Sequence, residues 1–132
     1  PGLLEIEITE SIRNAPEIDL KELIGKLRQA GFTVALDDFG TEYVNLSLLS
    51  SVEFDVLKLD KTMVDDMVNN PKAQAIIESI AGICKKMGIR VVAEGIETEE
   101  QMSVLRTCGV ETAQGYLFSR PIPVEEYEEK YL

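Results

Sequence analysis

Short apolar runs alternate with stretches of helical period along the whole chain. Five runs rich in Val, Ile, Leu and Thr predict strands at 3–8, 32–37, 54–59, 89–94 and 112–117. The segments between them repeat apolar residues every three or four positions and predict helices at 16–30, 43–50, 71–87, 98–107 and 124–131. Such alternation is typical of successive βα units, so the sequence predicts an α/β fold with parallel strands.

Polar residues at the ends of the predicted helices support these boundaries. Asn70 before Pro71 predicts an N-cap followed by a first-turn proline, and Thr98 with Gln101 three residues later predicts a capping box. Three of the helices finish with a cation near the last turn and then a glycine, at Gly31, Gly88 and Gly109. The two strands that follow the first two glycines are almost entirely apolar, which indicates a sheet with both faces covered.

Each predicted strand finishes on a side chain that can bind a metal, move a proton or hold an oxygen. In chain order these side chains are Glu7, the pair Asp37 and Asp38, Lys58, Glu94 and Gln114. Because parallel strands present their carboxyl ends at one edge of the sheet, we expect these groups to gather there. Five βα units are too few to close an eight-stranded barrel, so either the sheet stays open or the rest of the barrel lies outside this chain.

The charge of the chain limits its partners. At 132 residues it has the length of one domain, and 13 basic residues against 24 acidic ones leave a net charge of −11. Phosphate polymers and membrane surfaces are bound mostly by cations, so we expect neither as a partner. No secretory signal and no apolar run of about 18 residues is visible in these 132 residues, and we expect a soluble, cytoplasmic protein. The acidic residues of the last helix, Glu125, Glu126, Glu128 and Glu129, are expected to be surface charge.

The complete absence of histidine narrows the chemistry further. It excludes Ser-His and Cys-His nucleophile pairs and disfavours zinc. Acid–base work then falls to Asp, Glu or Lys, and a bound metal should be an oxygen-preferring cation such as Mg²⁺ or Mn²⁺. Cys84 and Cys108 lie in apolar helix patterns, which favours buried, unpaired thiols over a disulfide or a nucleophile.

Two candidate groups allow more than one interpretation. Asp37 and Asp38 end an apolar strand, where two carboxylates are costly to desolvate, so a pair of metals bridged by one of them is attractive. Alternatively, they cap the following loop through Gly40. Lys58 lies between apolar neighbours and should point into the barrel, where an ammonium needs a carboxylate or a polarised water. Glu5 shares a face with Glu7 but lies farther from the rim, which makes it the weaker candidate.

Five motifs in fixed order resemble the EAL family of bacterial phosphodiesterase domains, which hydrolyse cyclic di-GMP. They are Glu7-Ile8-Thr9-Glu10-Ser11, Asp37-Asp38-Phe39-Gly40-Thr41, Leu57-Lys58-Leu59-Asp60, Ala93-Glu94-Gly95-Ile96-Glu97-Thr98 and Gln114-Gly115-Tyr116-Leu117-Phe118-Ser119-Arg120-Pro121. The resemblance covers nearly the whole chain. It implies that residues 1–132 are the C-terminal portion of such a domain. It implies a partial TIM-like (β/α) barrel.

The resemblance also implies a role for each site residue. Glu7 and Asp37 would ligate a first metal, and Asp37 would bridge to a second near Asp38, with Glu94 close by. Lys58 would orient or deprotonate the attacking water. The remaining roles fall to residues around the site. Gln114 would help hold the ligand or its water network, Glu10 would anchor the loop from Phe39 to Leu46, and Glu97 would support the metal-binding residues without binding metal itself. The implied reaction opens cyclic di-GMP to linear pGpG.

Two departures from the family pattern limit this expectation. The family's Glu-Ala-Leu strand and a metal-binding Asn would precede Pro1, so we expect an incomplete two-metal site and little hydrolysis by the isolated chain. In the loop after Asp38, Glu42 replaces a glycine, and Val44 and Asn45 replace two serines. A glycine there could supply a positive φ, and Glu42 adds negative charge beside a site for an anion.

The sequence therefore leaves two functions open. The first is the C-terminal part of a cyclic di-GMP phosphodiesterase, favoured by the presence of the site residues Glu7, Asp37, Asp38, Lys58 and Glu94. The alternative is a catalytically degenerate EAL-like domain that senses cyclic di-GMP or binds proteins, favoured by the altered loop. Under either function, an open five-strand sheet would expose edges and apolar surface, and we expect a homo-oligomer that covers them.

Overall fold

The computed structural model describes residues 4–9, 19–39 and 46–132, with the side chains of 46–48 left aside. The described part contains five strands: β1 (Glu5–Thr9), β2 (Thr33–Phe39), β3 (Val56–Leu59), β4 (Arg90–Ala93) and β5 (Thr112–Ala113). It contains six helices: α1 (Leu20–Gln29), α2 (Leu46–Ser51), α3 (Lys61–Met67), α4 (Pro71–Met87), α5 (Glu99–Thr107) and α6 (Val124–Tyr131). No helix in these segments is both long and apolar enough to cross a bilayer.

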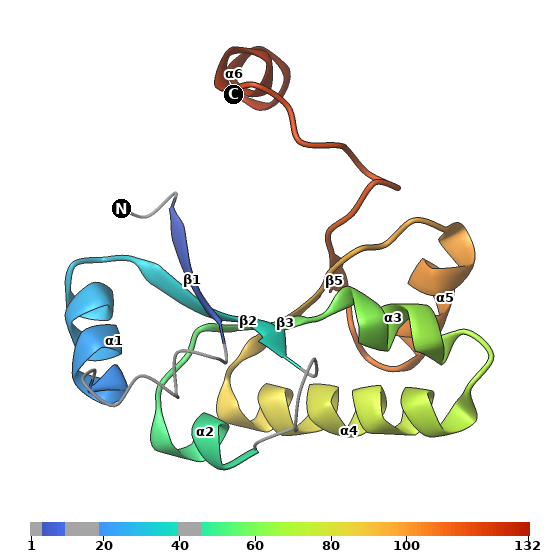
Figure 1. Ribbon diagram of the computed structural model, residues 1–132, viewed down its shortest axis with the longest axis horizontal. Helices are drawn as coiled ribbons and strands as arrows, with labels where there is room; N and C mark the ends of the chain where they lie inside the picture. Colours follow the sequence, from blue (N-terminus) through green and yellow to red (C-terminus); the bar gives the residue numbers. More distant parts are fainter. Residues whose placement is uncertain (1–3, 10–18, 40–45) are drawn as a thin grey trace.

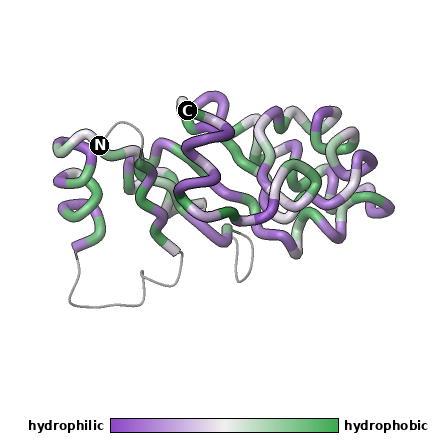
Figure 2. Tube along the Cα trace, turned by 90° about the horizontal axis from the view of Figure 1, so that it is seen from above, coloured by the Kyte–Doolittle hydropathy of each residue, from purple (hydrophilic) through white to green (hydrophobic). Residues whose placement is uncertain are grey.

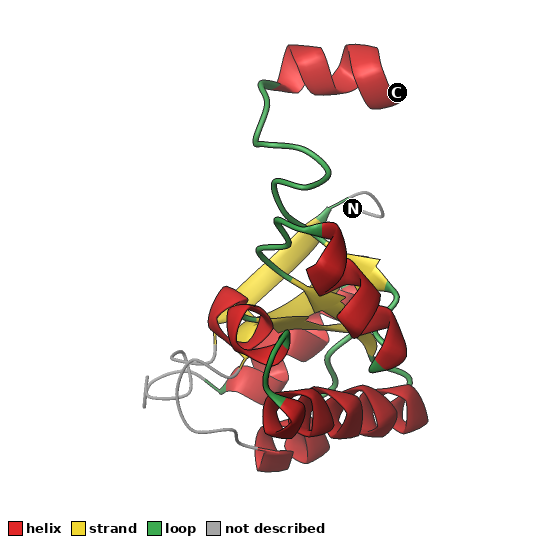
Figure 3. Ribbon diagram, turned by 90° about the vertical axis from the view of Figure 1, so that its right-hand side faces the viewer, coloured by secondary structure: helices red, strands yellow, loops and turns green. Residues whose placement is uncertain are grey.

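The strands form one parallel sheet in the order β1-β2-β3-β4-β5 (Figure 1). Each strand pairs with the next strand in the chain, so the sheet winds in one direction without reversing, as in a (β/α) barrel. Helices α1 to α5 lie on one side of the sheet, while α6 stands away from them at the end of an extended segment (Figures 1 and 3). The predicted α/β fold, a partial TIM-like barrel of five βα units, is confirmed.

The main hydrophobic core fills the space between the sheet and helices α1 to α5. It includes Leu36 and Leu57 from the sheet and Ile77, Ile80 and Leu105 from the helices, all at most 3% exposed. Figure 2 shows hydrophobic and hydrophilic residues alternating along the helices, which therefore bury one stripe each. The opposite face of the sheet carries a second, small cluster of Ala35, Val56 and Val92.

The predicted helix ends agree with the structure where they depend on local chemistry. The Asn70 side chain accepts hydrogen bonds from the backbone of Lys72 and Ala73, and Gly88 ends α4 in the left-handed conformation at φ 73°. Thr98 and Gln101 form the expected capping box at the start of α5. The prediction of buried, free thiols at Cys84 and Cys108 is also confirmed.

Several predicted boundaries were wrong. Helix α3 was not expected, because its seven residues include two aspartates and bury only Val64 and Met67. Strand β5 covers Thr112–Ala113 rather than 112–117, since the chain turns at Gly115. Strand β3 begins at Val56 rather than at position 54, and β1 extends to Thr9. Helix α1 begins at Leu20, where Asp19 caps it through the Glu22 backbone N–H; residues 16–18 and 43–45 of the predicted helices lie outside the described residues.

Candidate metal and phosphodiester site

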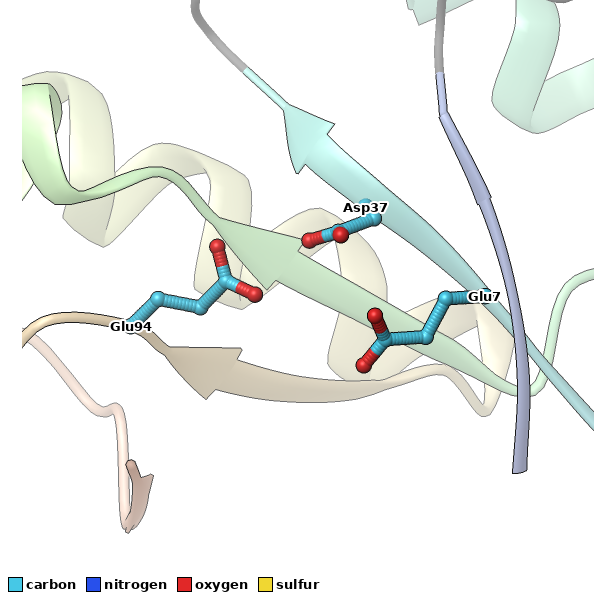
Figure 4. A group of neighbouring side chains, drawn as sticks. All are labelled: Glu7, Asp37 and Glu94. Atoms are coloured by element: carbon cyan, nitrogen blue, oxygen red, sulfur yellow. The ribbon is translucent and has the colours of Figure 1, made fainter. Parts of the chain in front are cut away.

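Acidic side chains from three strands converge at the carboxyl edge of the sheet. Figure 4 shows Glu7 from β1, Asp37 from β2 and Glu94 just after β4 directed toward one another. One carboxylate oxygen from each of the three lies within 4.8 Å of the others. Strand periodicity explains the convergence, because Asp37 and Glu94 lie two residues after Ala35 and Val92 and share the sheet face of that small cluster.

Lys58 occupies the centre of this group. It lies on β3 two residues after Val56, it is 3% exposed, and its Nζ donates a hydrogen bond to Glu7 and lies 3.0 Å from Glu94 Oε1. Burial alone would lower the pKa of Lys58, but the hydrogen bonds to Glu7 and Glu94 outweigh it and raise the pKa above its usual value. The expected carboxylate partners of a buried ammonium are therefore present, and Lys58 is cationic at neutral pH.

A bulge turns the two adjacent aspartates to the same site. The pairing of β2 with β3 shifts register between Leu36 and Phe39, and Asp38 between them has a positive φ of 56°. The Asp38 backbone N–H donates to Asp37 Oδ1 at 2.8 Å. In a regular strand, neighbouring side chains point to opposite faces. The bulge instead leaves Asp38 in a second carboxylate group with Asp60 and Glu94.

Asp60 is a member of the site that the sequence analysis did not single out. It directly follows β3 and caps α3, where its Oδ2 accepts hydrogen bonds from the backbone and hydroxyl of Thr62. Its oxygens come within 4.8 Å of ligand atoms of Asp38 and Glu94. A sequence signal existed, because Asp60 lies two positions after Lys58 and period-2 alternation sends both side chains to the same face.

Crowding of the carboxylates perturbs their proton affinities. Burial, followed by the hydrogen bond with Asp37, raises the pKa of Glu94 to about 7. Burial also acts to raise the pKa of Asp37, but hydrogen bonds from Glu94 and from the Asp38 backbone, with the charge of Lys58, lower it overall. Of these two hydrogen-bonded carboxylates, Glu94 therefore takes up a proton first as the pH falls. Burial and the charges of Asp37 and Asp60 raise the pKa of Asp38.

These residues fit hard divalent cations. Two groups of three carboxylates offer oxygen ligands alone, which suits Mg²⁺ or Mn²⁺ and excludes a typical zinc site. Burial first, and the neighbouring carboxylates second, raise the pKa values of Glu94 and Asp38, and a bound cation would favour the ionised form of both. Glu94 belongs to both groups, so it is a shared carboxylate of the described site; bridging by Asp37 stays a prediction.

The remaining predicted residues lie around this centre or outside the described part. Gln114 directly follows β5 with an exposed side chain, and its backbone pairs with Ala93 and Ile96 at 2.8 and 3.1 Å. Glu97 is exposed and lies 3.5 Å from Lys61 Nζ. Glu5 is directed to Arg90 at 3.5 Å and is not part of either carboxylate group. Glu10, Gly40 and Glu42, with Val44 and Asn45, lie outside the described residues.

Comparison with known proteins gives a consistent family. The EAL domain family model matches residues 1–121. The cyclic di-GMP phosphodiesterase RocR of Pseudomonas aeruginosa is 39% identical over 128 residues, which are 96% of this chain and 32% of that protein. The chain spans between 15% and 32% of the curated relatives that it matches.

Solved structures give the same result. The EAL domain of Mycobacterium smegmatis DcpA superposes with a TM-score of 0.86 at 37% identity, covering 97% of this chain and 57% of that one. Klebsiella pneumoniae BlrP1, in a complex with calcium and cyclic di-GMP, superposes with a TM-score of 0.82 at 40% identity, covering 89% and 30%. The chain belongs to the EAL domain family.

Proposed function

We propose that this chain is part of a metal-dependent phosphodiesterase that hydrolyses cyclic di-GMP to linear pGpG. The observation that carries the proposal is the convergence of Glu7, Asp37 and Glu94 around the buried ammonium of Lys58. RocR is named as a cyclic di-GMP phosphodiesterase, and BlrP1 has been solved with cyclic di-GMP together with calcium or manganese. These names supply the substrate and the class of metal, which the geometry alone leaves open.

The carboxylates would hold two divalent cations, one at Glu7, Asp37 and Glu94 and one at Asp38, Asp60 and Glu94. When bound, the cations would offset the charge of the anionic phosphodiester and make a water more acidic. Without them, a cluster this acidic would repel the substrate. Three-carboxylate groups leave ligand positions open, which supports the expectation that the two-metal site is incomplete in this chain alone.

Lys58 is assigned the task of orienting the attacking water. Burial acts to lower the pKa of Lys58, but the hydrogen bonds to Glu7 and Glu94 raise it overall, so the ammonium is a hydrogen-bond donor. Of the two roles expected from the sequence, we propose orientation, because Lys58 Nζ already donates to Glu7 and lies 3.0 Å from Glu94 Oε1; deprotonation of the water stays a prediction. Glu94 belongs to both carboxylate groups, so its catalytic part would be to hold the two cations as a shared ligand. Gln114, exposed directly after β5, would contact the ligand.

Turnover by the isolated chain is expected to be poor. The chain supplies five strands in its described part, and it covers only 57% of the DcpA EAL domain. Residues outside the matched region complete that fold, and the corresponding part is expected to contribute further ligands here.

The test compares this chain with the longest natural protein that contains it. Each is incubated with cyclic di-GMP and Mn²⁺ or Mg²⁺, the products are separated by chromatography, and binding is measured by calorimetry with Ca²⁺. We expect pGpG from the longer protein and little from the chain. Binding without hydrolysis by the longer protein would instead indicate the alternative function, a catalytically degenerate sensor of cyclic di-GMP. Absence of both binding and hydrolysis would contradict the proposal.

A further inference from the structure

The loop between β4 and α5 holds Glu94 in place through contacts at nearly every residue. The Glu94 backbone N–H donates to Leu59 O at 3.0 Å, and the Ile96 N–H donates to Gln114 O at 3.1 Å. Ile96 itself is fully buried. The loop is therefore fixed to β3 on one side and to the segment after β5 on the other, and two further contacts tie it to α3.

The first of these contacts is the side chain of Lys61, the first residue of α3. A Cβ added to Gly95, which has a φ of +71°, would lie 2.6 Å from Lys61 Cγ, so the lysine stem covers the backbone next to Glu94. Lys61 Nζ then binds Asp65 Oδ2 at 3.0 Å and lies 3.5 Å from Glu97 Oε1. These ion pairs are about half exposed, and exposed pairs of this kind contribute little by themselves.

The second contact is Gln101, which is 8% exposed. Its Oε1 accepts hydrogen bonds from the backbone N–H groups of Glu97 and Thr98 at 2.8 and 3.2 Å. Its Nε2 donates to Asp65 Oδ1 at 3.3 Å. One amide therefore both closes the loop that carries Glu94 and connects that loop to α3. Buried hydrogen bonds are the costly ones to break, so Gln101 is the strongest part of this connection.

Helix α3 begins at the other end of the same connection, with Asp60 as its N-cap. Asp60 and Glu94 belong to one carboxylate group, but they come from different elements. We propose that Gln101 and Asp65 are positioning residues: by joining α3 to the β4–α5 loop, they fix Asp60 relative to Glu94 and so set the affinity of that group for a divalent cation. The cation-binding part of this inference rests on the proposed function. The connection between α3 and the β4–α5 loop rests only on the contacts described above.

Gln101→Glu separates the two tasks of the amide. Glutamate keeps an acceptor for the Glu97 and Thr98 N–H groups, and it is a preferred residue at this position of a capping box. It loses the donor to Asp65 and sets two carboxylates against each other. Asp65→Asn in the same chain supplies a donor that faces the new carboxylate and should restore the connection. Ser103→Asp, on the exposed side of α5, is the control for added charge.

Two measurements are made on each variant. Hydrogen exchange of the backbone amides at 94–98 reports the loop, with the amides of α4 as the reference for global stability. Mn²⁺ affinity is titrated by electron paramagnetic resonance. For Gln101→Glu, loss of one hydrogen bond predicts about fivefold faster exchange at 94–98 and about fivefold weaker Mn²⁺ binding, with α4 unchanged. The added Asp65→Asn change should reverse both effects, and Ser103→Asp should show neither.

Unchanged exchange in Gln101→Glu would overturn the inference, because the loop would not depend on the connection. Faster exchange with unchanged Mn²⁺ affinity would also overturn it, since the network would then be purely structural. Failure of the double variant to recover would count against the Asp65 contact. Failure of the longer natural protein to bind Mn²⁺ would contradict the proposed function instead, and the exchange data would still decide whether the network holds the loop.

Discussion

Lys58 Nζ lies 3.0 Å from Glu94 Oε1, with Lys58 on β3 and Glu94 directly after the neighbouring strand β4. The same ammonium donates to Glu7, so one buried cation joins carboxylates from the first and fourth strands of the described sheet. A cation held by Glu7 and Glu94 would share their oxygens with this ammonium. The lysine therefore stabilises the metal-free site and competes with a bound cation for Glu7 and Glu94.

Replacing Lys58 should separate metal binding from catalysis. Lys58→Met keeps most of the side-chain volume but removes the charge, and we expect the turnover of the longer natural protein to fall about 100-fold or more. Mn²⁺ affinity should stay the same or rise, because the competing ammonium is gone. Lys86→Met, on the exposed side of α4, is the matched control. Loss of Mn²⁺ binding together with activity would show that Lys58 acts only by holding the site together.

The affinity for Mn²⁺ should depend on pH near neutrality. The pKa of Glu94 is raised to about 7, so below that pH a proton must leave before Glu94 can ligate. Affinity should therefore rise between about pH 6 and 8, by at most about tenfold per pH unit for one proton released. In the metal-free chain the linkage has the opposite sign. The stability that the raised pKa contributes is present below the unfolded value near 4.5 and is lost as the pH rises through 7.

Calorimetric titrations at several pH values, with Glu94→Gln for comparison, check this dependence. The amide cannot titrate, so the variant should bind Mn²⁺ weakly and with a flatter pH profile. Glu111→Gln, at an exposed position before β5, controls for the loss of one charge. An equally steep profile in Glu94→Gln would assign the proton to another group.

The backbone of Asp38 offers a separate test of the bulge. Its φ of 56° lies in the left-handed region, which Asn tolerates better than Ala. Asp38→Asn and Asp38→Ala remove the same charge, and both should weaken Mn²⁺ binding. The alanine variant should in addition be less stable than the asparagine variant by about 1 kcal/mol in urea unfolding. Equal stabilities would indicate that the left-handed conformation does not constrain this position.

Two glycines predict opposite effects of alanine. A Cβ on Gly115 would lie 2.3 Å from the backbone N and O of Ile96, so Gly115→Ala must displace the loop that follows Glu94. We expect a loss of about 2 kcal/mol or more, with weaker Mn²⁺ binding. Gly25 in α1 has no atom within 4 Å of an added Cβ, and Gly25→Ala should raise stability by about 0.5–1 kcal/mol. Thermal unfolding measures both, and a stable Gly115→Ala variant would contradict the close approach.

The sequence predicted the features that depend on neighbouring residues. Asn70 with Pro71, and Thr98 with Gln101, are local capping signals, and they mark helix starts without help from the rest of the fold. The convergence of Glu7, Asp37, Lys58 and Glu94 also followed from the sequence, because parallel strands end at one edge.

The features that were missed depend on contacts between distant parts of the chain. Helix α3 is short, and it is stabilised by burying Val64 and Met67 in the core. The pattern of residues within the helix does not predict that burial. Asp60 ends the motif Leu57-Lys58-Leu59-Asp60, and its position as the N-cap of α3 could not be predicted without that helix. Strand β5 ends early because Gly115 packs on Ile96, nineteen positions back, and that contact has no sequence signature.

Helix α6 carries the last prediction, which concerns self-association. Val124, Tyr127 and Tyr131 recur at helical spacing and are 67%, 48% and 50% exposed, and α6 buries no residue. The two tyrosine rings pack on each other with centroids 5.2 Å apart, so they form one continuous apolar face. Strand β1 also pairs only with β2 in the described residues, which leaves an open edge.

We expect the isolated chain to form a dimer or larger oligomer that covers this surface. Light scattering after size exclusion should show it at high protein concentration. The double change Tyr127→Ser and Tyr131→Ser should shift the chain toward monomer, whereas Glu128→Gln on the same helix should not. A wild-type chain that stays monomeric at high concentration would refute the prediction.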